Sequence, residues 1–293
     1  MPRLTRQFVT GEELDGAELG ALLDRAIELK AARGKVDAPR PLTGRSVALL
    51  FERPSTRTRI SFEVGVAELG ATPVVLRSDE LQLSRGESVG DTARILALYL
   101  HALVIRSGSH EIVAELATAD ELPIVNGLTP LHHPCQALAD LMTLRERFGE
   151  LDGLKLAYVG DGNNVARSLV VLGGLAGVEV VVSSPAGYEL EGVETVADPT
   201  VAVAGAHAVY ADVWVSMGDE ATADARRGAL APYRIDDALL DRAAPDAIAL
   251  HCLPAHPGEE ITAEVLYGRR QRIWDEAENR LHAQKALLEL LVE

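Results

Sequence analysis

The chain has 293 residues, a hydrophobic fraction of 47% and a formal net charge of −16 at pH 7. This length suits two domains, and the apolar content excludes wholesale disorder. The acidic balance argues against a nucleic-acid surface, which needs a basic face. No apolar run is long enough to span a membrane and no signal-peptide core is visible, so we expect no membrane association. Two distant cysteines, Cys135 and Cys252, favour a reducing cytoplasm.

Short apolar runs rich in β-branched residues alternate with helical patterns along the chain. The strand-like runs form two groups, 46–51, 72–77, 101–107 and 122–127, then 154–160, 178–184, 207–214 and 247–254. Apolar residues at helical spacing lie between them, notably over 60–70, 91–100, 135–149 and 164–177. This alternation is typical of parallel sheets covered on both faces, so the sequence predicts two doubly wound parallel-sheet α/β domains joined by helices.

The predicted domain boundary lies at the end of the helix over 133–148. The first domain is expected to cover 1–146 and the second 147–277. The last segment, 278–293, is a helix rich in Leu and Ala that is expected to pack back on the first domain. Its candidate packing residues are Leu281, Leu288 and Leu291.

The stretch FERPSTRTRISF (51–62) lies where the first strand passes into a helix. Ser55 is the predicted N-cap, and Thr56–Thr58 the first helical turn. Hydroxyls, backbone amides and Arg57 would then converge at the carboxyl end of a strand, where a phosphate-sized oxyanion can bind. The alternative is an ordinary capped helix with solvated arginines. No G-x-x-x-x-G-K-[ST] sequence is present, so this is not a nucleotide P-loop.

Two further stretches place polar side chains after predicted strands. His133 and Gln136 share one face at the start of a helix and can hold a carbonyl oxygen and an amine. Asp212 and the turn 216–218 follow the run HAVYA and would line a polar pocket. Each of these residues is also compatible with a purely structural role.

The run HCLPAH after the last predicted strand raises the possibility of a zinc site. His251, Cys252 and His256 are the candidate ligands. Neighbouring residues of an extended segment point to opposite faces, and no convincing fourth ligand follows. We therefore predict no metal.

Five motifs occur in a characteristic order, namely STRTR, HPCQALAD, DVWVSMG, HCLPAH and AENRLH. Together they resemble the aspartate/ornithine carbamoyltransferase family nearly end to end. The last three resemble the members that use ornithine as the acceptor. The resemblance implies a carbamoyl-phosphate domain, an ornithine domain and a homotrimer whose active sites are shared between subunits.

The resemblance assigns site residues by position. Those implied to bind carbamoyl phosphate are Ser55, Thr56, Arg57, Thr58, Gln82, Arg106, His133, Gln136 and Arg280, with Gln82 reaching a neighbouring subunit's site. Those implied to bind L-ornithine are Asn164, Asp212, Ser216, Met217, Cys252 and Leu253. The residues expected to act on the reacting atoms are Arg57, Arg106, His133 and Cys252.

The implied reaction transfers the carbamoyl group to the side-chain amine of L-ornithine, giving L-citrulline and phosphate. The amine must be neutral to attack, and no metal or organic cofactor is required. Both arginine synthesis and the reverse, catabolic direction fit the motifs. Ser84, Pro130, His132 and Pro257 depart from the residues common at their positions in the family, and bear on acceptor preference and rate.

Three other interpretations remain. The turn GDGNN suggests a dinucleotide-binding dehydrogenase, but it lacks G-x-G-x-x-G. A carbamoyl-phosphate-binding protein without catalysis is a second alternative, although every polar site residue is present. A third is a carbamoyltransferase for another amine such as putrescine. Putrescine has no α-carboxylate or α-ammonium group, so Asp212, Ser216 and Asn164 would have no such group to bind.

Overall fold

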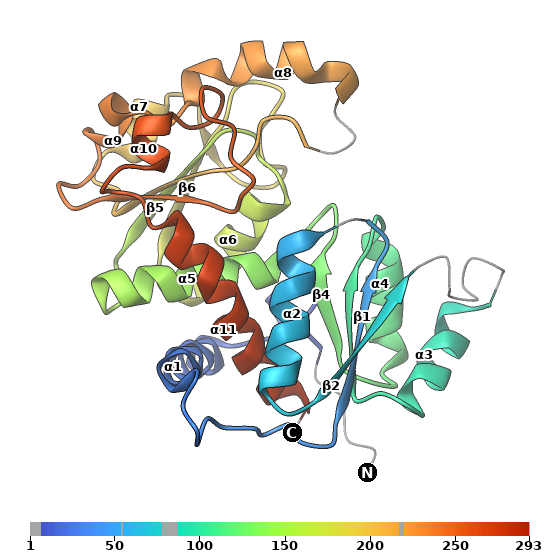
Figure 1. Ribbon diagram of the computed structural model, residues 1–293. Coiled ribbons are helices and arrows are strands. Elements are labelled where there is room, and N and C mark those ends of the chain that lie inside the picture. Colours follow the sequence, from blue (N-terminus) through green and yellow to red (C-terminus); the bar gives the residue numbers. More distant parts are fainter. Residues whose placement is uncertain (1–6, 54, 78–86, 217–219, 293) are drawn as a thin grey trace. The chain divides into compact units, whose positions relative to one another are not determined.

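The structure is a computed structural model that describes residues 7–53, 55–77, 87–216 and 220–292. The chain forms two compact units (Figure 1). The first consists of Met1–Met142 together with Asn279–Glu293, and the second of Thr143–Glu278. Each contains one parallel sheet with helices, which confirms the predicted fold class.

The sheet of the first unit has four parallel strands in the order β2-β1-β3-β4. The strands are β1 (Ser46–Phe51), β2 (Thr72–Arg77), β3 (Ala102–Arg106) and β4 (Ile124–Leu128). The helices that precede or connect them are α1 (Gly16–Ala32), α2 (Thr56–Glu68), α3 (Val89–Ala97), α4 (His110–Ala119) and α5 (Pro134–Phe148), the last of which continues into the second unit. Strands β1 and β3 are buried along nearly their whole length, as expected for a sheet that is covered on both faces.

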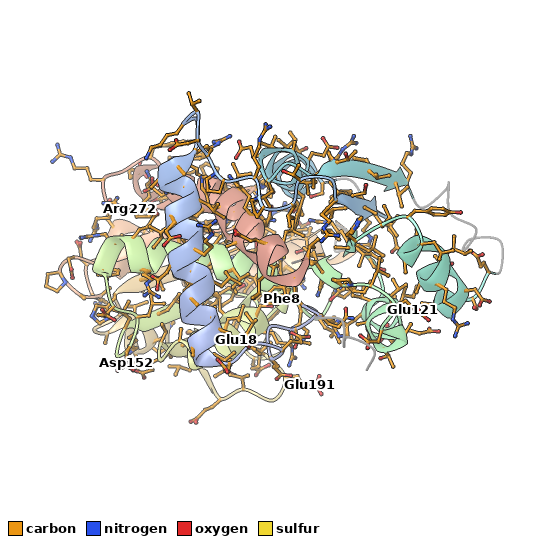
Figure 2. All side chains as sticks on the ribbon, turned by 90° about the horizontal axis from the view of Figure 1, so that it is seen from below. Phe8, Glu18, Glu121, Asp152, Glu191 and Arg272 are labelled. Atoms are coloured by element: carbon orange, nitrogen blue, oxygen red, sulfur yellow. The ribbon has the colours of Figure 1, made fainter. Side chains whose placement is uncertain are left out.

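The N-terminal segment is tied to the edge of this sheet. Phe8, labelled in Figure 2, is fully buried and forms a bridge with Val125 of β4. Helix α1 then begins with a capping box, in which the Asp15 side chain accepts from the Glu18 amide and Glu18 reaches back to the Asp15 amide.

The C-terminal helix α11 (Ile273–Val292) returns to the first unit, as predicted. Figure 1 shows it beside α1 and α2, and ion pairs join it to both, Arg25–Glu289 at 2.9 Å and Lys285–Glu68 at 2.8 Å. Gly65 of α2 permits close packing, because a Cβ there would lie 3.2 Å from Lys285 Cγ and 3.4 Å from a Leu281 methyl. This packing brings Arg280 to the site described below.

The sheet of the second unit has five parallel strands in the order β7-β6-β5-β8-β9. The strands are β5 (Lys155–Val159), β6 (Glu179–Ser183), β7 (Thr195–Val196), β8 (Ala208–Ala211) and β9 (Ile248–His251). The helices are α6 (Asn164–Leu175), α7 (Pro199–Val203), α8 (Ala223–Leu230), α9 (Asp237–Leu240) and α10 (Ala263–Leu266), with 3₁₀ turns η3 (Glu220–Thr222) and η4 (Ala231–Tyr233). The two-residue β7 was not predicted, because so short a strand leaves no periodic pattern.

Acidic side chains are spread over the surface. Glu121, Asp152 and Glu191, all labelled in Figure 2, are exposed. No helix in the described part of the chain is long and apolar enough to cross a membrane.

Candidate functional site

The first group of predicted site residues lies at the switch point of the first sheet, where the strand order reverses between β1 and β3. Ligands of such sheets gather at the carboxyl ends of the strands at this point. Ser55 follows β1 and takes the N-cap position of α2, with extended backbone angles of φ −154° and ψ 108°. Its hydroxyl makes no capping bond and instead accepts from Arg106 Nη1 at 3.2 Å. The N-cap prediction is therefore right for the position of Ser55 and wrong for its side chain, which binds Arg106 in place of a helix amide.

Arg280 joins three of the predicted residues in the same unit. Its Nη2 donates to Thr58 Oγ1 at 2.8 Å, and its Nη1 donates to Gln136 Oε1 and lies 3.4 Å from His133 Nε2. Gln136 in turn donates from Nε2 to Asp140 Oδ1 at 2.8 Å. All five side chains are buried. The structure therefore brings residues from α2, α5 and α11, together with His133 directly before α5, into one polar cluster. Asp140 was not predicted, although its i+4 spacing from Gln136 in HPCQALAD was a usable signal.

His133 is a neutral imidazole in this cluster. Its burial lowers its pKa well below the usual value of 6.5, and the positive charges of Arg280, Arg106 and Arg57 lower it further. Since an arginine can only donate, His133 Nε2 must accept from Arg280, which places the ring proton on Nδ1.

Thr56 and Arg57 lie in the first turn of α2 and are exposed, whereas Thr58 is buried. The neighbouring Cys135 is fully buried, and its burial raises the pKa of its thiol to about 12, so it is an inert core residue. Gln82, the predicted contact to a neighbouring subunit, lies outside the described residues, as does Ser84.

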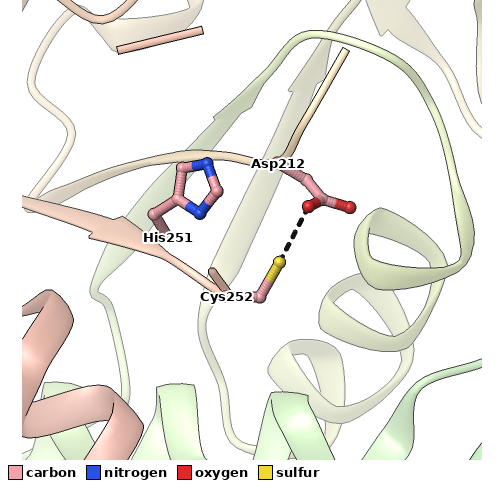
Figure 3. Close-up of side chains that lie close together, drawn as sticks. All are labelled: Asp212, His251 and Cys252. Carbon is pink, nitrogen blue, oxygen red and sulfur yellow. Dashed lines mark hydrogen bonds between the residues drawn. The ribbon is translucent and has the colours of Figure 1, made fainter. Parts of the chain in front are cut away.

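The second group lies at the corresponding switch point of the second sheet, between β5 and β8. Asp212 follows β8 and is 8% exposed. Its Oδ1 accepts from the Cys252 thiol at 2.8 Å (Figure 3). The same Oδ1 accepts from the Val213 amide at 2.7 Å, and Oδ2 accepts from Asn163 Nδ2 at 2.7 Å. Asp212 thus links the carboxyl ends of β5, β8 and β9, and its carboxylate is held in a fixed position.

Asn163 was not predicted as part of the site, whereas its neighbour Asn164 was. Asn163 is the N-cap of α6 and accepts from the Val165 and Ala166 amides at 2.9 and 3.2 Å. Asn164 is the first residue of that helix and is half-buried. An Asn directly before a helical pattern is a capping signal, which could have identified Asn163.

The loop after β9 is held by His251. Its Nδ1 accepts from the Leu253 amide at 2.8 Å, and its Nε2 lies 3.1 Å from Glu260 Oε1, which also accepts from the His256 amide at 2.5 Å. Because Nδ1 accepts, Nε2 carries the proton and donates to Glu260. Leu253 takes a left-handed conformation with φ 58° and precedes a cis Pro254. Glu260, fully buried and nine residues from His251, was not predicted.

Among the described residues, two groups of side chains offer ligand atoms close enough for a metal ion. They are Asp212 with His251 and Cys252, and His256 with Glu259 and Glu260. The argument that His251 and Cys252 point to opposite faces was wrong, because Cys252 already lies beyond the end of β9, where the backbone turns. In the first group, however, both His251 nitrogens are engaged and Cys252 donates to Asp212.

Ser216 is the last described residue before the gap at 217–219 and is half-buried. The predicted contact at the backbone of Met217 lies outside the described residues.

Comparison with known proteins extends these observations. Residues 6–146 match the family model described as aspartate/ornithine carbamoyltransferase, carbamoyl-P binding domain, and residues 152–291 match the one described as aspartate/ornithine carbamoyltransferase, Asp/Orn binding domain. An ornithine carbamoyltransferase from Acidothermus cellulolyticus is 53% identical over 99% of this chain and 97% of its own. One from Parafrankia sp. is 50% identical over 98% of this chain and 96% of its own.

Solved structures agree with the sequence matches. The structure of ornithine carbamoyltransferase from Pyrococcus furiosus superposes with a TM-score of 0.93 at 43% identity, covering 98% of this chain and 97% of that one. That of the Thermus thermophilus ornithine carbamoyltransferase gives a TM-score of 0.90 at 40% identity, covering 99% of this chain and 100% of that one. The chain belongs to the aspartate/ornithine carbamoyltransferase family.

Proposed function

We infer that the protein transfers the carbamoyl group of carbamoyl phosphate to the side-chain amine of L-ornithine, giving L-citrulline and phosphate. The observation that carries this inference is the buried cluster in which Arg280 binds Thr58, Gln136 and His133 near the start of α2. The relatives with 50% and 53% identity are named for the same reaction.

For carbamoyl phosphate, the proposed phosphate cradle is the start of α2 with Ser55, Thr56 and Arg57. Backbone amides at a helix N-terminus and a guanidinium suit an anion of this size. Arg106 approaches the same place through its bond to Ser55. The proposal also includes Gln82 from a neighbouring subunit.

The carbonyl oxygen of carbamoyl phosphate is the proposed ligand of Arg57, Thr58, Arg106 and His133. Thr58 Oγ1 already accepts from Arg280, so its hydroxyl proton remains for an acceptor on the substrate. Attack by the amine places negative charge on this oxygen, so hydrogen-bond donors to it lower the activation free energy of the reaction. Removing one such donor typically raises that barrier by about 3 kcal/mol. Gln136 is the proposed contact to the carbamoyl nitrogen.

For L-ornithine, we assign the α-ammonium to Asp212 and Ser216, and the α-carboxylate to Asn164 and the backbone at Met217. Asp212 is suited to this role because three donors orient its carboxylate while the residue remains 8% exposed. Cys252 and the carbonyl of Leu253 are assigned to the side-chain amine. This amine has a pKa of about 10.4 in water, so the site must select its neutral form.

We further propose a cytoplasmic homotrimer with shared active sites that serves arginine biosynthesis. An apolar surface on and just after α3 supports contact with another copy of the chain. Ile95, Leu98 and Tyr99 are large, exposed and spaced so that they share one helix face.

The decisive experiment measures product formation from carbamoyl phosphate with four acceptors side by side, namely ornithine, putrescine, aspartate and N-acetylornithine. Citrulline from ornithine should form with the highest kcat/KM. A preference for putrescine would support the alternative carbamoyltransferase. Binding of carbamoyl phosphate without turnover of any acceptor would support a non-catalytic protein.

A further inference from the structure

Arg226 of α8 contacts three separate loops at the carboxyl ends of the strands in the second unit. Its Nη2 forms an ion pair with Asp161 Oδ2, and its Nε donates to the Trp214 carbonyl at 2.7 Å. Its guanidinium carbon lies 5.2 Å from the centre of the Tyr188 ring. The side chains of the ion pair are only 14% and 19% exposed. A guanidinium with three such partners is a fixed part of the structure and not a solvated surface charge.

The loops that Arg226 joins also carry the proposed ornithine contacts. Asp161 lies in the turn between β5 and α6, two residues before Asn163, and Trp214 lies two residues after Asp212. The Tyr188 carbonyl accepts from the Gly162 amide at 2.8 Å, which fastens the third loop to the same turn. Arg226 therefore spans the switch point between β5 and β8 in parallel with the Asn163–Asp212 hydrogen bond.

Asp161 and Asp212 are two carboxylates in one small region. Both raise the pKa of the buried Tyr158 hydroxyl, after its burial, which has the larger effect. The same hydroxyl donates to the Asp161 carbonyl at 2.9 Å and to Asn163 Oδ1 at 3.2 Å. Ornithine brings one α-ammonium to this site, so it needs one uncompensated carboxylate and not two.

We propose that Arg226 is a positioning residue that holds the ornithine loops together and neutralises Asp161, leaving Asp212 as the carboxylate that selects an acceptor with a single α-ammonium. This role rests on the proposed function. It gives Arg226 an influence on affinity and selectivity for the acceptor, with no direct contact to the reacting atoms.

The test compares steady-state kinetics of Arg226→Ala, Arg226→Lys and the double variant Arg226→Ala/Asp161→Asn with the wild type. In Arg226→Ala, KM for ornithine should rise roughly tenfold or more, the scale of a lost hydrogen bond to a charged group. KM for carbamoyl phosphate should stay within about twofold, because its proposed contacts lie in the first unit. The ratio of kcat/KM for ornithine to that for putrescine should fall, since a second carboxylate favours a diamine.

The other two variants separate the role of charge from that of geometry. Arg226→Lys keeps a cation beside Asp161 but loses the fork that also reaches the Trp214 carbonyl, so selectivity should recover while KM for ornithine stays raised. Without Arg226, the Asp161 carboxylate would carry an uncompensated negative charge. The double variant Arg226→Ala/Asp161→Asn removes that carboxylate and should therefore also restore selectivity for ornithine. Arg227→Ala is the matched control, because this neighbour on α8 makes an exposed pair with Glu259 and should leave both KM values unchanged.

A loss of kcat with both KM values and selectivity unchanged would show that Arg226 supports only folding, and would overturn the inference. If Arg226→Ala fails to fold, the kinetics of Arg226→Lys test the proposal instead. A wild-type KM for ornithine in Arg226→Lys would contradict the positioning role. A wild-type enzyme that forms no citrulline would overturn the proposed function itself, which the variant comparison alone cannot do.

Discussion

At the residue scale, Arg57 differs from Arg59, the other arginine of α2, because its charge lowers the pKa of His133. Arg57→Ala should lower kcat/KM by roughly 100-fold or more, because the variant loses a donor to the developing oxyanion and a contact to phosphate. The exposed side chain should leave thermal unfolding unchanged. Arg59→Ala is the control, since Arg59 makes an exposed pair with Glu63 at 2.7 Å. Near-normal kcat/KM in Arg57→Ala would refute the assignment of this residue.

Cys252 is proposed as a positioning contact and not a covalent nucleophile. Its thiol is the donor in the bond to Asp212, and a serine hydroxyl can replace it there. Cys252→Ser should therefore raise KM for ornithine while measurable turnover remains. Kinetics with mass spectrometry of the quenched enzyme test this. Complete loss of activity in the folded variant, or a trapped carbamoyl group on Cys252, would contradict the proposal.

The site could be predicted from sequence only as far as local motifs reach. Residues that lie at strand ends, such as Ser55 and Asp212, stood out because polar groups followed apolar runs. The pairing of Arg106 with Ser55 and of Cys252 with Asp212 was not predicted, because the two members of each pair lie 51 and 40 residues apart in the chain. Such pairs depend on the order of strands in the sheet, which chain order does not specify.

At the element scale, α6 packs closely on β6 at Gly173, where no side chain would fit without a shift. A Cβ at Gly173 would lie 2.6 Å from a Val180 methyl, whereas one at Gly174 would meet nothing within 4 Å. Gly173→Ala should lower the free energy of unfolding by about 1–3 kcal/mol through overpacking. Gly174→Ala should raise it by up to about 1 kcal/mol through helix propensity. Urea denaturation of both variants checks this, and equal effects would contradict the packing argument.

The sequence was most informative about long elements with clear periodicity. The strands around 46–51 and 102–106 and the helix ending at Phe148 were predicted closely. The start of α11 was predicted at 278, but the helix begins at Ile273. The earlier start was missed because IWDE carries mixed polarity. Glu276 is nevertheless buried, and its carboxylate accepts from the Tyr210 hydroxyl and the His251 amide.

At the scale of the whole molecule, the proposed shared site can be tested by mixing two inactive chains. Gln82→Ala and Arg57→Ala should each be nearly inactive alone. If Gln82 acts on a neighbouring subunit, mixed trimers contain some sites with both wild-type residues and should regain part of the activity. The measurement is citrulline formation after verified subunit exchange. No recovery would count against a site that two subunits share.

The acid stability of the protein should depend on His282, a buried residue of α11. Its pKa is lowered to about 4, mainly by burial and then by the positive charges of Lys285, Lys30 and Arg33, while Glu68 opposes the shift. The unfolded chain takes up a proton near pH 6.5 but the folded chain only near pH 4, so stability that is full above pH 6.5 is lost as the pH falls through this window. Between pH 8 and 5 the loss should be about 1–2 kcal/mol, allowing for solvent screening. His282→Gln should reduce the difference in unfolding free energy between pH 8 and pH 5, even if the substitution also changes stability at pH 8. Urea unfolding of both proteins at the two pH values measures this difference. An unchanged difference between the two pH values would show that His282 does not cause the acid sensitivity.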